Sequence, residues 1–144
     1  MPADDVTDAW RARAKQWLEF ARTPGHDVFF DQLNLPSFAE LLSGPAGVFC
    51  VAIPNPVNAP AGSRARYFDE MPGSATVARD GLSMEFVWID RPLSFYTEAL
   101  ASSGFVIERV REPRPSAGTV TRHPELAAAR DTPFCLHLRC RRVG

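Results

Sequence analysis

The stretch from Trp88 to Pro115, WIDRPLSFYTEALASSGFVIERVREPRP, constrains the fold more than any other part of the chain. A proline in the first turn of a helix costs no hydrogen bond, so Pro92 suits a helix start, and apolar residues then recur at helical spacing. Gly104 predicts the end of this helix, because glycine adopts the left-handed cap conformation without strain. Residues 105–110 are typical of a strand, which the prolines after them prevent from continuing. The stretch therefore predicts a helix with one buried face, a tight turn and a strand.

Length and composition indicate a single globular domain. The 144 residues suffice for one core, and 45% hydrophobic and 23% charged residues are ordinary values. The net charge of −1 and the scattered arginines disfavour nucleic-acid and anionic-membrane partners. No apolar run approaches the roughly 20 residues of a membrane helix, and the acidic start MPADDVTDAW does not resemble a signal peptide. We therefore expect one cytoplasmic domain over residues 1–144, without nucleic-acid or membrane partners.

The cysteines and histidines give no sign of a disulfide framework or a metal centre. Cys50, Cys135 and Cys140 are an odd number and form no CxxC pair, and the chain has three histidines in all. The cysteines lie in apolar surroundings, so we expect buried, reduced thiols and no metal.

The N-terminal part of the chain predicts helices. Residues 8–22 have an apolar stripe at helical spacing. A second helical segment is expected from about Asp27 to Leu35, ending before the proline that follows it. Ser37 and Glu40 have the spacing of a capping box, which predicts a third helix that ends at Leu42.

Two apolar segments predict the strands of the core. Residues 48–53, VFCVAI, are apolar without alternation, which indicates a strand covered on both faces by helices. Residues 134–141 alternate between two sets of side chains and predict a last strand, with His137 as an ordinary sheet residue. A short helix is expected before it, over 124–130.

A β-hairpin is expected between residues 64 and 89. Residues 64–69 and 75–79 are candidates for short strands, and Asp80-Gly81 is a two-residue turn signal. In residues 82–89, Leu82, Met84, Phe86 and Trp88 alternate with Ser83, Glu85, Val87 and Ile89, which predicts a strand.

Together, these segments resemble class I methyltransferases that use S-adenosylmethionine, in an actinobacterial-type branch of that superfamily. The unit RPLSFYTEALASSGF with the exit EPRP is similar to the family's last helix–strand unit. WRARAKQWLEFARTPGHDVFF is similar to its N-terminal cap helices, PAGVFCVAIPNPVN to its fifth strand, and FCLHLRCRR to its last, antiparallel strand. The hairpin resembles the lid over the substrate. The resemblance implies an α/β, Rossmann-like fold with a small mixed sheet, with cap helices over 1–43 and the sheet and lid over 44–144.

The middle of the family fold has no counterpart in this sequence. Five residues separate Leu42 from Val48, where the family has several βα units, roughly 80 to 100 residues. No GxGxG turn occurs, and no acidic residue ends a second strand, although the family holds its cofactor with both. The resemblance therefore implies a truncated member that does not bind S-adenosylmethionine, and we expect no cofactor.

His26 and Asp27 are the first candidates for catalysis. They follow a Pro-Gly turn and would lie at the mouth of the site in the family's architecture. An imidazole beside a carboxylate can act as a general acid or base near neutral pH. The alternative is that Asp27 caps the second helix and His26 is solvated.

The other candidates come from the hairpin and the helix after it. Tyr67 and Glu85 are secondary catalytic candidates, and Trp88 and Tyr96 are candidates for contact with substrate under the lid. The alternative for all four is ordinary packing of the hairpin and helix.

Three further substrate-binding candidates follow from the resemblance. Asn55 and Asp90 stand where the family branch tends to have histidine. Asp90-Arg91 could clamp an anion or a carboxylate, although an aspartate before Arg-Pro is also typical of a helix start. Both Asn55 and Asp90 are also common turn residues.

Three functions are compatible with these features. One is a small-molecule enzyme that no longer uses S-adenosylmethionine and performs acid–base cyclisation, isomerisation or hydration on a natural-product substrate. Another is a non-catalytic relic that binds a small molecule or pairs with a full-length methyltransferase. The third is a methyltransferase completed by a partner chain. The retained cap and lid favour the first, because both serve the substrate and not the stability of the sheet.

The sequence also predicts a homodimer. Without the missing units, the strand Val48–Ile53 would have an unpaired apolar edge that contains no charge or proline. A two-fold dimer closes such an edge, either by direct pairing of the strands or by exchange of the N-terminal helices.

Overall fold

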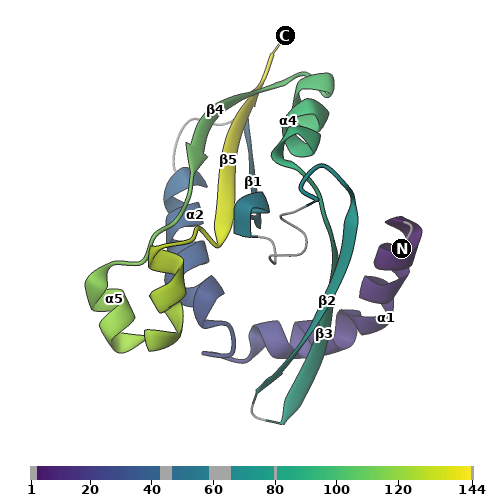
Figure 1. The fold of residues 1–144 in the computed structure, drawn as a ribbon. Coiled ribbons are helices and arrows are strands. Elements are labelled where there is room, and N and C mark those ends of the chain that lie inside the picture. The colour runs from purple at the N-terminus through teal and green to yellow at the C-terminus, as the bar shows by residue number, and fades with distance from the viewer. Residues whose placement is uncertain (1–2, 43–46, 59–65, 80, 144) are drawn as a thin grey trace.

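The chain combines helices with two small sheets, as the sequence predicts for an α/β protein. The computed structural model describes residues 3–42, 47–58, 66–79 and 81–143. The elements in chain order are α1 (Ala3–Arg22), η1 (Phe30–Asn34), α2 (Leu35–Leu42), β1 (Val48–Pro54), η2 (Pro56–Asn58), β2 (Met71–Arg79), β3 (Leu82–Asp90), α4 (Leu93–Ser102), β4 (Phe105–Arg111), α5 (Ala117–Arg122), η3 (Pro124–Arg130) and β5 (Cys135–Arg142). Figure 1 shows two groups of elements, a sheet with α2 and α4 on it and a hairpin with α1 beside it.

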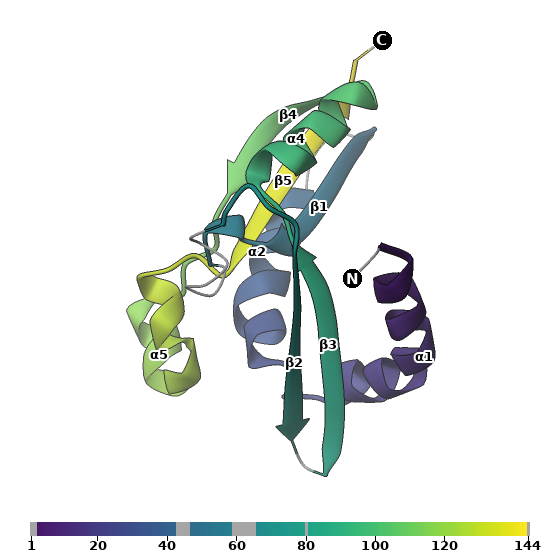
Figure 2. The same ribbon diagram turned by 45° about the vertical axis from the view of Figure 1, so that its right-hand side comes forward.

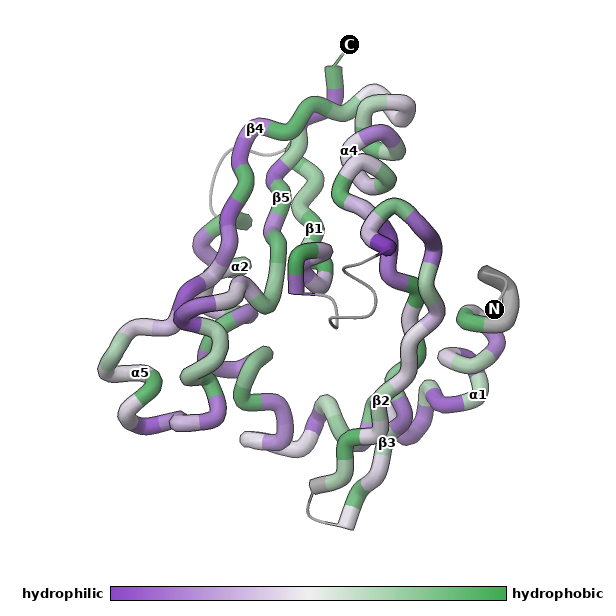
Figure 3. The backbone as a smooth tube through the Cα atoms, in the orientation of Figure 1, coloured by the Kyte–Doolittle hydropathy of each residue, from purple (hydrophilic) through white to green (hydrophobic). Residues whose placement is uncertain are grey.

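The last strand is the centre of the three-stranded sheet, whose order is β1-β5-β4. β5 is antiparallel to both neighbours, with Val51 opposite Leu138 on one side and Ile107 opposite Cys140 on the other. Figure 3 shows a mostly hydrophobic β1, whereas hydrophobic and hydrophilic residues alternate along β4. A central strand is covered on both faces, and the first six residues of β5 are buried.

One face of β5 carries the hydrophobic core. Leu136, Leu138 and Cys140 alternate along the strand and lie on this face together. Partly buried side chains from three elements pack against them, namely Val51, Ile53, Leu100, Phe105 and Ile107. Gly104 ends α4 with a φ of 76°, which lets the chain turn directly from the helix into β4. The predicted helix, glycine stop and strand are therefore confirmed.

The opposite face of β5 is polar and lies under α2. His137 is 0% exposed, and the Phe38 ring packs edge-on against it at 5.3 Å between centroids. Arg139 Nη1 donates to the Leu41 carbonyl oxygen at 3.4 Å. Arg111, opposite His137 in the register, donates to the Glu40 carboxylate at 3.0 Å. Burial and the nearby Arg111 charge lower the pKa of His137, so its imidazole is neutral in the folded protein.

The predicted helix break at Pro36 is wrong. Residues 30–34 form a π-helical turn that continues into α2 through Leu35, whose φ of −60° and ψ of −48° are helical. A proline in a helix lacks an N–H group and crowds the carbonyl one turn earlier. A wider π turn just before Pro36 accommodates both effects. The predicted capping box is wrong too, because Ser37 lies inside α2.

The hairpin is shorter at its start than predicted. β2 and β3 pair over nine residues each, from Met71 opposite Asp90 to Arg79 opposite Leu82. The predicted strand at 64–69 is wrong in its described part, because residues 66–69 form a turn in which Asp69 N donates to the Arg66 carbonyl oxygen at 2.9 Å. Residues 64–65 and Asp80 lie outside the described residues. Residues 66–69 therefore add no strand to the hairpin, which spans 71–90.

Helix α1 holds the hairpin from one side. The Trp10 indole Nε1 donates to the Val87 carbonyl oxygen at 2.8 Å, and Arg13 forms an ion pair with Glu85. Figure 2 shows the hairpin standing apart from the three-stranded sheet, with α1 alongside it. The space between hairpin and sheet is where the pocket lies.

The excursion before β5 contains one helix that the sequence did not predict. Ser116 Oγ accepts from Thr119 N at 3.0 Å and caps the short helix α5. The predicted helix over 124–130 is present as the 3₁₀ helix η3. Among the described helices, none has both the length and the apolar character needed to cross a bilayer.

The predicted homodimer concerns the free edge of β1. Within the described residues, β5 is the one strand paired with β1. Phe49 on this strand is 44% exposed. We expect light scattering at micromolar concentration to give the mass of a dimer, and Phe49→Glu to reduce it to a monomer, because a charge prevents the two edges from approaching. Val110→Glu is the control, since Val110 is 57% exposed on the other edge strand, β4. A monomeric wild type contradicts the prediction.

His137 should make stability depend on pH. The pKa of His137 is lowered in the folded state from an ordinary 6.5. As the pH falls, the unfolded chain therefore takes up its proton before the folded protein does. The contribution of neutral His137 is therefore complete above pH 6.5 and is lost as the pH falls below it, by at most about 1.4 kcal/mol per pH unit. Urea unfolding at about pH 7.5 and about pH 5.5 should show a larger loss for the wild type than for His137→Gln. Equal losses would contradict this.

Candidate functional site

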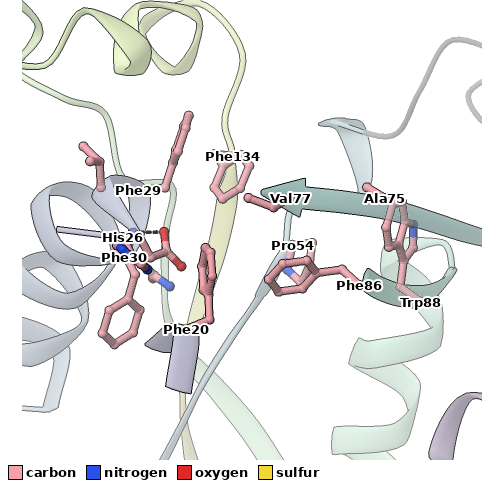
Figure 4. Close-up of a pocket in the computed structure, with 13 residues that line it drawn as sticks. Phe20, His26, Phe29, Phe30, Pro54, Ala75, Val77, Phe86, Trp88 and Phe134 are labelled. Carbon is pink, nitrogen blue, oxygen red and sulfur yellow. Dashed lines mark hydrogen bonds between the residues drawn. The ribbon is translucent and has the colours of Figure 1, made fainter. Parts of the chain in front are cut away.

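A cavity of about 580 Å³ lies between the hairpin and the helical segment that follows α1. The end of β1 and the start of β5 close it from the sheet side. Figure 4 shows His26, Phe29 and Phe30 on one side, and Ala75, Val77, Phe86 and Trp88 on the other. The full lining is Phe20, His26, Asp27, Val28, Phe29, Phe30, Asn34, Pro54, Ala75, Val77, Phe86, Trp88 and Phe134.

The hairpin side of the pocket follows from strand pairing. Ala75 lies opposite Phe86, and Gly73 lies opposite Trp88, so these side chains share one face of the hairpin. The Trp88 indole lies directly over the Gly73 backbone, where an added Cβ would come within 2.5 Å of the ring. Glycine at position 73 therefore sets how far the indole withdraws from the pocket.

The helical side is built from aromatic rings. Phe20, at the end of α1, is buried and contacts the Phe86 ring edge-on at 6.3 Å and the His26 ring at 5.3 Å. Phe29 packs on Phe134 at 4.5 Å between ring centroids. The turn after α1 is closed by His26 N, which donates to the Thr23 carbonyl oxygen at 3.2 Å. This turn folds the chain back, so that His26 lies against the last turn of α1.

Polar side chains form a small minority of the described lining. Three of the thirteen residues are polar, and all three come from the segment between α1 and α2: His26, Asp27 and Asn34. The ligand that fits such a pocket is largely apolar, with a few polar atoms at one end.

Asp27 both caps a helix and lines the pocket. Its Oδ1 accepts from Phe30 N at 2.9 Å, which is the helix-capping contact expected as the alternative to catalysis. The same residue lines the pocket.

Burial and, second, the Asp27 charge raise the pKa of the Cys135 thiol to about 11. Cys135 therefore stays protonated near neutral pH and is a poor nucleophile.

His26 is only 5% exposed and is the one imidazole in the described lining. The alternative to catalysis for His26, in which its side chain is solvated, is therefore wrong. Trp88 is the third predicted site residue that lines the pocket. The fold thus brings together three of the nine candidates, namely His26, Asp27 and Trp88.

The other two catalytic candidates lie outside the lining. Glu85 points to α1 and pairs with Arg13. The Tyr67 hydroxyl accepts from Leu93 N at 2.9 Å and so satisfies a donor at the start of α4.

The remaining substrate candidates also lie elsewhere. Asn55 is buried, donates to Glu112 Oε1 at 2.7 Å and accepts from Val57 N at 3.1 Å, which shapes the loop after β1. Asp90, Arg91 and Tyr96 surround the start of α4, where burial raises the pKa of Tyr96. Arg91 donates to Glu70 at 3.0 Å and stacks over the Phe95 ring at 4.6 Å. These contacts fit the alternatives to substrate binding, in which the residues pack or shape turns and the start of a helix.

Most pocket residues were not apparent from the sequence. Phe29, Phe30 and Phe134 are apolar residues of the kind expected in any core, and Asn34 is an isolated amide. One signal was available, because FFDQLN follows directly on His26-Asp27-Val28 and so carries two phenylalanines close to the candidate catalytic pair.

The cysteines and acidic residues do not form a metal centre in the described part of the chain, where no group of three His, Cys, Asp or Glu side chains could hold an ion. The three cysteines are free thiols, with Cys135 and Cys140 buried and Cys50 half-buried.

No protein-family model matches the chain, and no curated protein matches it. Among solved structures, it is similar to a protein from Listeria monocytogenes assigned as an S-adenosylmethionine-dependent methyltransferase. The TM-score is 0.48 and the identity 22%, over 67% of this chain and 48% of that one. It is also similar to an S-adenosylmethionine-dependent methyltransferase from Mesorhizobium loti, with a TM-score of 0.45 and 28% identity, over 69% of this chain and 49% of that one. The chain spans about half the length of these two structures.

The contact between Gly73 and Trp88 gives a direct test of the pocket wall. In Gly73→Ala the new methyl group would overlap the indole, so Trp88 must rotate out of its place on the hairpin. We expect a shifted tryptophan emission maximum and a loss of stability of about 1–3 kcal/mol in urea unfolding. Gly118→Ala is the matched control, because its added Cβ meets nothing closer than 3.7 Å. Unchanged emission in Gly73→Ala would contradict the described packing.

Proposed function

We propose that this protein binds a largely apolar, ring-containing small molecule in the aromatic pocket and catalyses proton transfer on it with His26 and Asp27. The observation that carries the proposal is the division of the pocket, in which the polar groups share one segment and face a wall of aromatic and aliphatic side chains. Aromatic rings favour flat apolar ligands, through stacked and edge-on contacts.

The proton-transfer step assigns His26 as the base that removes a proton from the ligand or as the acid that returns it. An imidazole can do both near neutral pH, as the base in its neutral form and as the acid once it has taken up the proton. Asp27 keeps one carboxylate oxygen on the cap of the helix and has a second to interact with the ligand or the imidazole. The raised pKa of Cys135 speaks against thiolate catalysis near the pocket.

We also propose that the pocket derives from the substrate site of a methyltransferase. The segments that carry the sequence resemblance include the turn after α1, the end of β1 and the hairpin, all of which line it. α2 leads to β1 through five residues, and the sequence contains no GxGxG turn. We therefore propose chemistry without S-adenosylmethionine on a small molecule. Cyclisation, isomerisation and hydration all require such proton transfers.

Binding is tested by titrating the protein with fluorene, a flat hydrocarbon, while the tryptophan fluorescence is recorded. We expect saturable quenching, because Trp88 lies in the pocket wall. Val77→Arg should abolish it by filling the cavity with a charged side chain, whereas Val110→Arg, outside the pocket, should not. Absence of saturable binding in the wild type would refute the proposed function.

Proton transfer is tested with 2-tetralone in heavy water, where NMR follows exchange of the protons next to the carbonyl. A base removes the proton to give the enolate, and a deuteron from solvent replaces it. We expect the wild type to accelerate exchange on the order of 10²-fold, and His26→Gln and Asp27→Asn each to reduce this. Asparagine still caps a helix, so Asp27→Asn separates the capping role from the catalytic one. Full acceleration in both variants would refute the assignment of His26 and Asp27, and no acceleration by the wild type would leave a non-catalytic binding protein.

A further inference from the structure

Asn34 is a pocket residue whose amide is held from behind by the core of the sheet. Its Oδ1 lies within hydrogen-bond distance of His137 Nε2 on the buried polar face of β5. Asn34 also lines the pocket from the π-helical turn η1. One side chain therefore connects the sheet core with the ligand cavity.

The chemistry of this pair determines which atom carries the proton. A carbonyl oxygen can only accept, so His137 Nε2 must carry the hydrogen and donate it to Asn34. The other ring nitrogen, Nδ1, is buried without a partner in the described structure and can remain a bare lone pair in the neutral ring. Charging the ring would bury an unsatisfied N–H group near Arg111, so the neutral Nε2–H form is the favoured one.

Fixing the oxygen also orients the rest of the amide. The amide group is planar, so its NH₂ group projects away from His137, and it has no acceptor among the described residues. We infer that this NH₂ group is a preset hydrogen-bond donor for a carbonyl oxygen of the ligand, with Asn34 as the specificity-determining residue and His137 as the residue that positions it. The inference rests on the proposed small-molecule site and adds a substrate class to it, namely flat apolar ketones.

The donor should give a measurable preference between two ligands of the same shape. Fluorene and 9-fluorenone are planar tricyclic molecules that differ at one position, where fluorenone carries a carbonyl oxygen. An oriented neutral hydrogen bond corresponds to a preference for fluorenone of about five- to tenfold in Kd. Fluorescence titration of the wild type with each compound measures this ratio.

Four variants separate specificity from structure. Asn34→Leu should bring the ratio of the two Kd values to about one, because the donor to the carbonyl oxygen is lost; it also removes the acceptor of His137 Nε2–H, so the readout is the ratio within the variant and not its affinity for fluorene. Gln32→Leu makes the same change at an exposed position of the same helical turn and should keep the preference. His137→Leu should lower the preference by freeing the amide to rotate, and His137→Gln should restore it, because its amide N–H can take the place of the imidazole donor. A general loss of structure would weaken binding of both compounds together.

Each outcome decides between the two claims. If the wild type binds fluorene and fluorenone equally well, the inference about Asn34 is wrong and the proposed pocket stands. Retention of the preference in Asn34→Leu would also overturn the inference. If the wild type binds neither compound, the proposed function itself fails.

Discussion

The burial of β5 between β1 and β4 is the constraint on which the rest of the structure depends. Both edges of this strand are occupied, so its backbone groups are satisfied in a sheet of only three strands. Leu136, Leu138 and Cys140 supply the fully or nearly fully buried surface on one face, and neighbouring strands and α4 contribute the partly buried side chains around it. Each buried leucine contributes on the order of 1.5–3 kcal/mol, more than the roughly 0–1 kcal/mol of a typical surface ion pair. Strands and helices near β5 are therefore positioned by its core residues.

The same strand also connects the core to the pocket, because its second face is polar. Burying His137 and Arg139 is costly unless they find partners; the Leu41 carbonyl of α2 accepts from Arg139, and Asn34 of the π turn η1 accepts from His137. This requirement explains why a widened helical turn before Pro36 lies over the sheet. It also means that a pocket residue is oriented by a group in the most buried part of the protein, which makes the polar end of the pocket its best-defined part.

The hairpin side of the pocket has a different basis. The hairpin has no strand-to-strand link to the three-stranded sheet in the described structure, and aromatic contacts of Trp10 and Phe20 with Phe86 hold it to α1. Such contacts stabilise by roughly 0.5–1.5 kcal/mol each beyond the burial of area. A wall held by a few rings can adjust to a ligand more readily than the sheet side can. The pocket thus combines one preorganised end with one adaptable wall.

The sequence alone determined the local elements whose causes are local. Gly104 ended α4, the apolar run 48–53 predicted β1, and alternation over 82–89 and 134–141 predicted β3 and β5, because backbone preference and hydrophobic period act over a few residues. Pro36 failed as a helix stop, since tertiary contacts of α2 with the sheet outweigh the local cost of the proline. Only the tertiary structure decided the membership of the site. Asp27 and His26 were identifiable from the sequence as candidates, but Asn34, Phe134 and Phe86 are far apart in the chain, and no spacing rule relates them. Glu85 and Tyr67 looked equally suitable by residue type but form an ion pair with Arg13 and a hydrogen bond with Leu93 N, because the direction in which a side chain points is set by the pairing of its strand or turn with distant segments.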